Sequence, residues 1–109
     1  MYYFTWRSPV REGKLRTFHT LEIPFVFQNI DESKPMTGFG EDRYALAERM
    51  SAAWAAFART GNPSVKSLPA WAPFKADTRA TMILNNESKL VNDPNKEERL
   101  ALEALRLQA

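Results

Sequence analysis

His19 is the residue of this 109-residue chain best suited to acid–base chemistry, and it is the only histidine. Imidazole is the side chain whose unperturbed pKa suits proton transfer near neutral pH. The residue lies in the segment TFHTLEIPFVF (residues 17–27), where a short polar stretch precedes an apolar, aromatic run. This change in composition predicts a loop that leads into buried structure. His19 is therefore the candidate general base, and a purely structural histidine is the alternative.

Glu22 follows His19 by three residues and raises the question of a metal site. The spacing suits two ligands on one face of a helix, but a zinc site needs three or four protein ligands. The chain has no cysteine and no second histidine to complete the set. We therefore expect no bound metal and no cofactor.

Residues for covalent catalysis are missing from the sequence. The absence of cysteine excludes a thiolate nucleophile. No serine lies in a Gly-x-Ser-x-Gly nucleophile motif, and no Gly-Gly pair is present to form an oxyanion-hole loop. Because a histidine without an activated serine has no acyl transfer to drive, we expect the isolated chain to be inactive.

The charge balance argues against several partners. The chain has 15 Lys+Arg and 13 Asp+Glu, a net charge of +2, which is too small to indicate a nucleic-acid surface. Four basic residues gather before His19, but Glu12 interrupts them, so we interpret the stretch as a solvated loop. No apolar run is long enough to span a membrane, and we expect no membrane partner. The lack of cysteine favours a cytoplasmic location, although any signal peptide would lie on a preceding part of a longer protein.

The amino-terminal half predicts one strand and one long helix. Residues 2–6 are aromatic or β-branched, with Tyr2, Phe4 and Trp6 on one side and Tyr3 and Thr5 on the other, which predicts a strand with two apolar faces, as in a covered sheet. A loop over 8–17, a short helical turn around Pro24 and a polar connection over 29–40 follow. Apolar residues then recur at helical spacing from Glu41 to Arg59, and Gly61 and Pro63 end that helix. Its predicted core positions are Leu46, Met50, Ala53, Trp54 and Phe57. Its predicted solvent-exposed positions are Arg43, Glu48 and Arg49.

The remaining residues predict a hairpin and a terminal helix. A proline-rich stretch over 62–80 is expected to be irregular, held to the body by Trp71 and Phe74. Two apolar runs, 81–84 and 89–91, flank a polar turn and predict a hairpin. Asp93 is predicted to cap a helix that begins at Pro94. The leucines of that helix spread widely around it, so we expect it to be buried in a larger body or to contact another chain.

Several of these landmarks resemble, in the same order, the carboxyl-terminal region of the type B carboxylesterases. This α/β-hydrolase family includes the para-nitrobenzyl esterases and the cholinesterases. The resemblance covers most of the chain and combines short matches that are each weak alone. The matching segments are YYFTW (2–6), the histidine segment (17–27), WAAFARTGNP (54–63), LPAW (68–71), TMIL (81–84) and NDP (92–94).

The resemblance implies a fold and a function. Residues 1–109 would form a single carboxyl-terminal segment of an α/β-hydrolase domain, of mixed α and β structure and dominated by helices. His19 would be the triad histidine, the general base and acid in carboxylic ester hydrolysis, and Glu22 would support its loop by hydrogen bonding. The serine, the triad acid and the oxyanion hole would lie on an upstream part of the hydrolase, which is the expected partner together with the ester substrate.

Two further questions concern side chains near His19 and the isolated chain itself. Phe18, Phe25 and Phe27 are candidates to line an acyl pocket, with packing as the favoured interpretation.

A strand cut from its sheet exposes apolar edges and faces, so we expect the isolated chain to form a homo-oligomer. The alternative to an esterase segment is a non-enzymatic interaction module or a truncated gene product.

Overall fold

The structure is a computed structural model and describes residues 1–108. Short helical turns follow the first strand, and a 19-residue helix separates that strand from a hairpin. The elements are β1 (Tyr2–Phe4), η1 (Val10–Gly13), α1 (Ile23–Val26), α2 (Lys34–Thr37), α3 (Asp42–Thr60), β2 (Ala80–Leu84), β3 (Lys89–Asn92) and α4 (Lys96–Gln108).

The three strands form one mixed sheet in the order β1-β2-β3. β1 and β2 are parallel, with Tyr2 opposite Met82, and β2 and β3 are antiparallel, with Thr81 opposite Val91. A parallel pair needs a long crossover, and α1, α2 and α3 lie within it. Within residues 1–108, β1 pairs with β2 alone, so its other edge is open.

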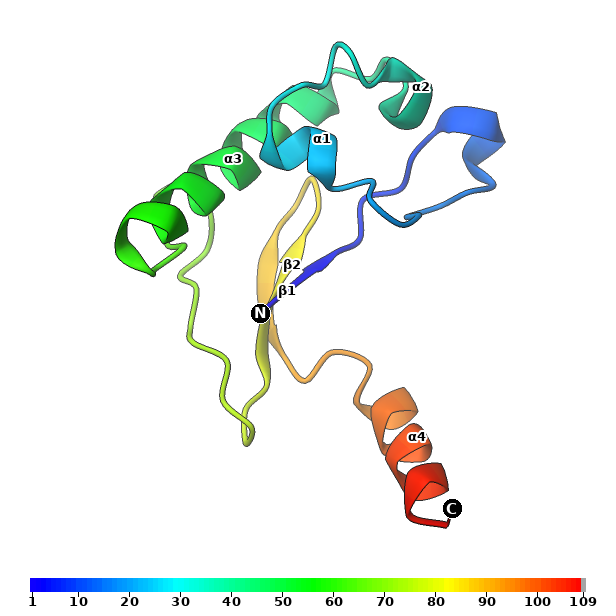
Figure 1. Cartoon of the computed structure of the whole chain (residues 1–109), viewed down its shortest axis with the longest axis vertical. Coiled ribbons are helices and arrows are strands. Elements are labelled where there is room, and N and C mark those ends of the chain that lie inside the picture. Colours follow the sequence, from blue (N-terminus) through cyan, green and yellow to red (C-terminus); the bar gives the residue numbers. More distant parts are fainter. Residues whose placement is uncertain (109) are drawn as a thin grey trace.

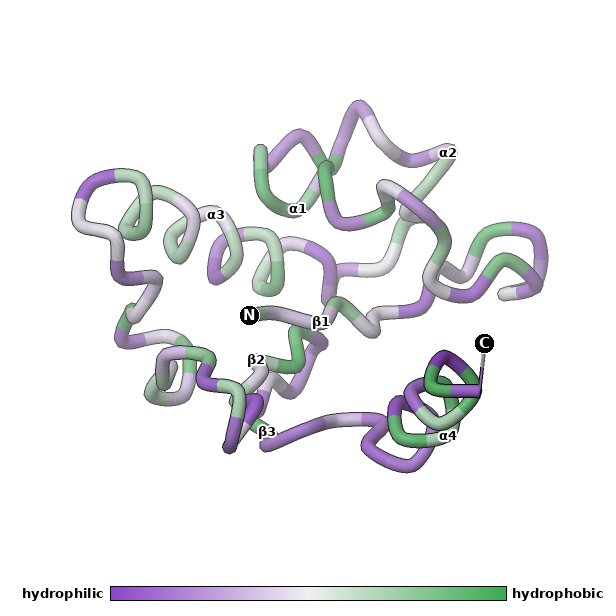
Figure 2. Tube along the Cα trace, turned by 60° about the horizontal axis from the view of Figure 1, so that its bottom comes forward, coloured by the Kyte–Doolittle hydropathy of each residue, from purple (hydrophilic) through white to green (hydrophobic). Residues whose placement is uncertain are grey.

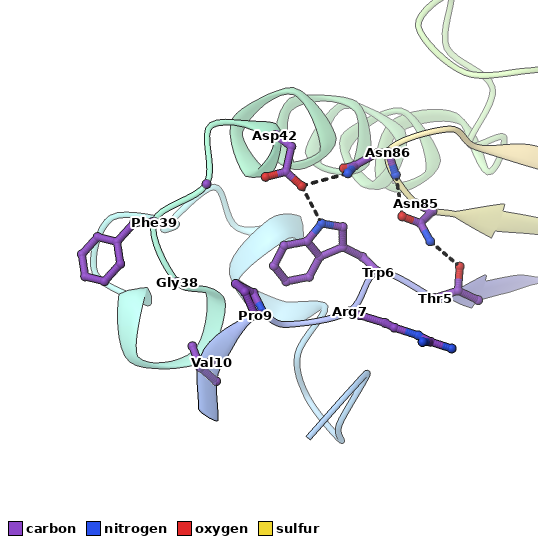
Figure 3. A pocket seen from close by; sticks show the side chains of 11 residues that line it. Thr5, Trp6, Arg7, Pro9, Val10, Gly38, Phe39, Asp42, Asn85 and Asn86 are labelled. Atoms are coloured by element: carbon purple, nitrogen blue, oxygen red, sulfur yellow. Dashed lines mark hydrogen bonds between the residues drawn. The ribbon is translucent and has the colours of Figure 1, made fainter. Parts of the chain in front are cut away.

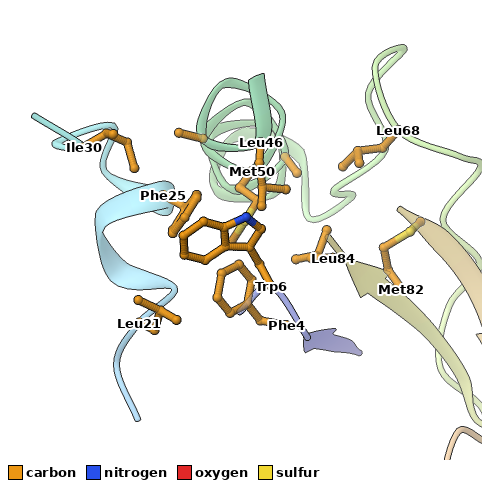
Figure 4. Close-up of a cluster of buried hydrophobic side chains, with 12 residues drawn as sticks. Phe4, Trp6, Leu21, Phe25, Ile30, Leu46, Met50, Leu68, Met82 and Leu84 are labelled. Atoms are coloured by element: carbon orange, nitrogen blue, oxygen red, sulfur yellow. The ribbon is translucent and has the colours of Figure 1, made fainter. Parts of the chain in front are cut away.

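One hydrophobic core lies between the sheet and the helices α1 and α3, which pack against each other (Figure 1). Trp6 lies at the centre of the buried cluster, between the side chains of α1 and those of α3 (Figure 4). The opposite face of the sheet is open at β1, where Tyr3 is 45% exposed, whereas Thr81 of β2 on that face is buried. The predicted strand is therefore correct in position, but it ends at Phe4, and Phe4 is its one buried residue in the described chain. The buried cluster comprises Phe4, Trp6, Leu21, Phe25, Ile30, Leu46, Ala47, Met50, Ala53, Leu68, Met82 and Leu84.

The long helix is confirmed as α3, but one residue predicted to be solvent-exposed is buried. Leu46, Met50 and Ala53 are buried as expected, and Gly61 ends the helix with φ 77°. Arg43, however, is only 1% exposed. Its Nε donates to the Gly40 carbonyl at 2.6 Å, and its Nη1 donates to Ile30 and Thr37. These acceptors satisfy the buried guanidinium, which is why a charge is tolerated there.

The carboxyl-terminal end of α3 is more exposed than the helical pattern predicts. Trp54 is half-buried and meets Tyr2 edge-on, with ring centroids 4.8 Å apart. Phe57 is 58% exposed, so its prediction as a core residue is wrong for this chain. Phe57 lines an open pocket of about 270 Å³ with Tyr2, Trp54 and Trp71, and no element within residues 1–108 closes that pocket over its ring.

The short turns of the crossover are partly predicted. The turn around Pro24 is confirmed as α1, a helix of four residues. The sequence predicts a polar connection in the region of α2, because Pro35 lies within it and Gly38 directly follows it. A four-residue helix has too few positions to give a helical pattern, so this element was missed.

The hairpin is confirmed, but the predicted cap of α4 is wrong. The helix begins at Lys96, and the Asp93 carboxylate instead accepts hydrogen bonds from Arg99, at 2.6 Å from Nη2, and pairs with Arg79. No residue of α4 is buried within the described chain, and Leu107 is 90% exposed. In Figures 1 and 2, α4 stands away from the layer of α1 and α3. Among residues 1–108, no helix has both the length and the apolar character needed to cross a membrane.

Candidate functional site

His19 lies on the loop that joins β1 to α1, as the sequence predicts. The residue is exposed and borders an open depression of about 590 Å³ beside β1. Tyr2, Phe4, Thr17 and Glu22 are among the residues that line this depression. The imidazole is thus accessible to solvent and stands next to the unpaired edge strand.

The backbone immediately after His19 is strained. Thr20 has φ 70°, a left-handed conformation that is a genuine outlier for a β-branched residue. Its hydroxyl donates to the His19 carbonyl at 2.5 Å. Backbone strain of this kind costs on the order of 1–3 kcal/mol and occurs preferentially at functional sites. Seven other non-glycine residues of the described chain also have positive φ, and Thr20 differs from them in its β-branched side chain.

Glu22 shares the depression with His19, but the two side chains do not contact one another by hydrogen bond or ion pair in the described chain. The carbonyl of Glu22 accepts hydrogen bonds from the backbone amides of Phe25 and Val26 and so begins α1. Within residues 1–108, neither the imidazole nor the Glu22 carboxylate has a hydrogen-bond partner. The imidazole nitrogens are thus free for groups outside this segment, and the supporting role of Glu22 remains a prediction.

The three phenylalanines near His19 differ in environment. Phe25 is fully buried and packs against Phe4 and Trp6, with ring centroids 5.2 Å and 5.0 Å away. Phe18 packs against the edge of the same core. Phe27 is 73% exposed and points away from that cluster. Phe25 is therefore a packing residue, and Phe27 lies exposed on the surface.

A network of hydrogen bonds fixes the start of the loop that carries His19. The Thr17 hydroxyl donates to the Trp6 carbonyl at 2.7 Å, which closes the loop over residues 7–16. The indole Nε1 of Trp6 donates to Asp42 Oδ2 at 2.9 Å, and the same oxygen accepts from Asn86 Nδ2 at 2.8 Å (Figure 3). Sequence reasoning missed Thr17 and Asp42, because Trp6 and Asp42 lie 36 positions apart and no local pattern links them.

The electrostatics of this network centre on Asp42. Partial burial raises the pKa of its carboxyl group, but hydrogen bonds from Trp6, Asn86 and its own backbone, with the charge of Arg43, outweigh that effect. The net result is a pKa below the ordinary value of an aspartate. Asp42 is therefore ionised at neutral pH and presents a charged acceptor to the indole N–H.

The described residues offer few other groups that could bind a metal ion or act as a nucleophile. Within the part of the chain that the structure describes, no three histidine, cysteine, aspartate or glutamate residues are grouped to hold a metal ion. Ser8 is 1% exposed, and its hydroxyl donates to the Met36 carbonyl at 2.6 Å. That serine is a structural residue, and His19 remains the candidate for proton transfer in the described chain.

Comparison with known proteins places these features in a family. The sequence model of the carboxylesterase family matches residues 1–103. Para-nitrobenzyl esterase of Bacillus subtilis (strain 168) is 38% identical over 104 residues, which are 94% of this chain and 21% of that protein. Phenmedipham hydrolase of Pseudarthrobacter oxydans is 38% identical over 90 residues, 79% of this chain and 18% of that protein. The chain thus spans about a fifth of the length of these curated relatives.

Solved structures agree with the sequence matches. A para-nitrobenzyl esterase structure superposes with a TM-score of 0.82 at 36% identity and covers 92% of this chain and 21% of the esterase. A carboxylesterase of Geobacillus stearothermophilus gives a TM-score of 0.76 at 36% identity, covering 93% of this chain and 21% of that enzyme. With a family match over residues 1–103 and two esterase structures that share this arrangement of strands and helices, the chain belongs to the carboxylesterase family.

Proposed function

We propose that this chain supplies the triad histidine, His19, to a serine carboxylesterase of the α/β-hydrolase fold. The observation that carries the proposal is the position of His19, exposed on a strained turn after an edge strand, within a chain that the carboxylesterase family matches over residues 1–103. In α/β-hydrolases the histidine comes last in the chain order of the triad. A segment that spans a fifth of its relatives is long enough to contain this residue without the other two.

The role of His19 follows from the chemistry of acyl transfer. Its imidazole takes the proton of a serine hydroxyl as the oxygen attacks the ester carbonyl, and the tetrahedral intermediate forms. The imidazolium then protonates the departing alcohol, and in the second half-reaction His19 activates a water molecule in the same way. The imidazole has no hydrogen-bond partner within residues 1–108, so a carboxylate of the preceding segment has access to one ring nitrogen while the other faces the serine.

The preceding part of the hydrolase is the proposed partner of this chain. The open edge of β1 offers unpaired backbone groups next to His19, and a strand added there would continue the sheet. The uncovered sheet face around Tyr3 offers apolar surface for the same partner. Such docking would bring a serine nucleophile and an oxyanion hole to the depression that His19 borders.

A second proposal concerns the isolated chain, which exposes apolar surface on several elements. Leu102, Leu105 and Leu107 of α4 are 64%, 62% and 90% exposed. In the absence of the partner this surface favours self-association, so we propose that the isolated chain is inactive and forms a homo-oligomer. The lack of cysteine is consistent with a reducing compartment, and we propose a cytoplasmic location.

The test is hydrolysis of para-nitrophenyl acetate and butyrate by the purified chain, alone and mixed with the segment that precedes it in its gene. We expect activity only in the mixture, and we expect His19→Ala to abolish it. Glu22→Gln should lower activity far less, by roughly tenfold or less, because a supporting hydrogen bond is worth about 1 kcal/mol. Activity of the mixture that survives His19→Ala would refute the assignment of the general base.

A further inference from the structure

Both flanks of the His19 segment rest on one residue, Trp6. On the amino-terminal side, the Trp6 carbonyl accepts the Thr17 hydroxyl at 2.7 Å, two residues before His19. On the carboxyl-terminal side, the Trp6 indole packs against Phe25, six residues after His19, with ring centroids 5.0 Å apart. Residues 18–24, which include the strained turn at Thr20, thus lie between two contacts with Trp6, and Leu21 within them is buried in the same core.

Trp6 is itself held in a fixed orientation. The residue is 4% exposed, and Figure 4 shows its ring enclosed between Phe25, Phe4 and the side chains of α3. Its one polar atom, Nε1, reaches the rim of the core and donates to Asp42 Oδ2 at 2.9 Å (Figure 3). A buried ring with a charge-assisted hydrogen bond at its edge has one favoured rotamer. The core packing and the Asp42 carboxylate together therefore fix the orientation of the ring against which Phe25 packs.

We propose that Trp6 and Asp42 are positioning residues for His19, with Asp42 fixing the indole and Trp6 holding both ends of the segment that carries the imidazole. This inference rests on the proposed function of His19 as general base. Neither residue touches the reacting atoms. Their effect is to keep the imidazole within reach of its partners, where a displacement of about 1 Å costs on the order of a hundredfold in rate.

The hydrogen bonds that Trp6 makes with Asp42 and Thr17 can each be removed by a substitution that leaves no cavity in the core. Asp42→Ala removes the acceptor, and Asp42→Asn keeps an oxygen at the same place. On the loop side, Thr17→Val removes the hydroxyl from an exposed residue of nearly equal shape, and Thr17→Ser restores it. Glu48→Ala is the matched control, because Glu48 is an exposed acidic residue of the same helix, α3.

The first readout is amide hydrogen exchange in the purified chain. The amides of Leu21 and Ile23 donate to Phe18 and Thr20, so they report on the turn that presents His19. Asp42→Ala and Thr17→Val should each speed exchange of these amides about three- to tenfold, as expected for the loss of one hydrogen bond. Asp42→Asn, Thr17→Ser and Glu48→Ala should leave it near wild type. The amides of β2 serve as the internal control for an intact fold.

The second readout is hydrolysis in the mixture with the preceding segment. Asp42→Ala and Thr17→Val should lower kcat roughly tenfold to a hundredfold with KM unchanged, and the two conservative variants should restore it. Unchanged exchange at Leu21 and Ile23 in both disruptive variants would overturn the positioning proposal. Altered exchange in a mixture that has no His19-dependent hydrolysis would instead refute the proposed function and leave the anchoring intact.

Discussion

Thr20 is the residue at which the local structure departs most from the preference of its side chain. A left-handed conformation costs an L-residue roughly 1–2 kcal/mol, and a β-branched side chain is disfavoured further. The position follows the proposed general base directly, so the strain coincides with the residue that needs a fixed orientation. The strained turn therefore lies directly beside the proposed general base.

Replacing Thr20 by glycine tests whether the strain is real. Thr20→Gly should raise the free energy of unfolding by roughly 0.5–1 kcal/mol, because glycine adopts positive φ without penalty but adds entropy to the unfolded chain. Urea denaturation followed by tryptophan fluorescence measures the change. Thr78→Gly, at an exposed turn without positive φ, should destabilise instead. A loss of stability in Thr20→Gly equal to that in the control would contradict the strained turn.

Arg43 provides a second residue-level test. Its guanidinium is buried and donates to Gly40, Ile30 and Thr37. Arg43→Met leaves these acceptors without donors in the interior and should lower the free energy of unfolding by about 2–4 kcal/mol. Arg59→Ala, at an exposed position of the same helix, should change it by less than about 0.5 kcal/mol in the same denaturation experiment. Equal effects would show that Arg43 is solvated.

The sequence predicted residues whose role is local and missed those whose role depends on distant partners. His19 was singled out because its type and the composition around it are unusual, and its catalytic role stays a prediction. Arg43 was assigned to solvent because helical spacing treats every charge as exposed, and its acceptors come from three separate turns. Asp42 was missed because its partners, Trp6 and Asn86, lie on other elements.

At the scale of elements, α4 is attached to the body by charge more than by apolar contact. Arg99 donates to Asp93 and to Glu103, and Arg79 also pairs with Asp93. The hydrogen bond from Arg99, with the positive charges of Arg99, Arg79 and Lys96, lowers the pKa of Asp93 despite some opposing desolvation. Because its pKa is lower in the folded chain, the contribution of Asp93 is complete above the unfolded value of about 3.9 and is lost as pH falls through the folded value.

The attachment of α4 should therefore fail in acid. A helix of 13 residues is marginal on its own in water, so its amides should lose protection from hydrogen exchange as pH falls below about 4. Asp93→Asn should show the same loss at pH 7, while the amides of β2 stay protected. Asp77→Asn is the control, because the exposed Asp77 carboxylate accepts a local hydrogen bond from the adjacent Thr78 amide. Protection of α4 that is independent of pH and of Asp93 would contradict this account.

Long or regular elements were predicted well from the sequence, and short or context-dependent ones were not. α3 has five turns of consistent spacing, and the hairpin has a polar turn between two apolar runs, so both were placed to within two residues. α2 is a single turn and gives no pattern. The start of α4 was misplaced because Asp93 has the composition of a cap, while its carboxylate is used by two arginines.

At the scale of the whole molecule, the chain is more extended than a self-contained domain. Its radius of gyration is 15.6 Å, against about 13 Å for a compact chain of this length. Its accessible surface is 7581 Å², against about 6200 Å² for a compact monomer of this mass. The excess lies on the elements that lack a neighbour, chiefly β1, the end of α3 and α4.

Self-association is the consequence expected for the isolated chain. Light scattering coupled to size exclusion should give a mass of at least twice the 12.5 kDa of one chain. Adding the preceding hydrolase segment should replace this oligomer by a hetero-complex, because both compete for the same apolar surface. A monodisperse monomer with a closed apolar surface would contradict the proposal and would favour an independent interaction module.

A chimera can show whether His19 is the general base of a carboxylesterase. Residues 1–108 would replace the matching fifth of the Bacillus subtilis para-nitrobenzyl esterase, which is 38% identical. The measurement is kcat/KM for para-nitrophenyl butyrate in the chimera and in its His19→Ala variant. We predict an active chimera and a fall of at least roughly a thousandfold on substitution. An active chimera whose kcat/KM changes only a few-fold without His19 would contradict the account.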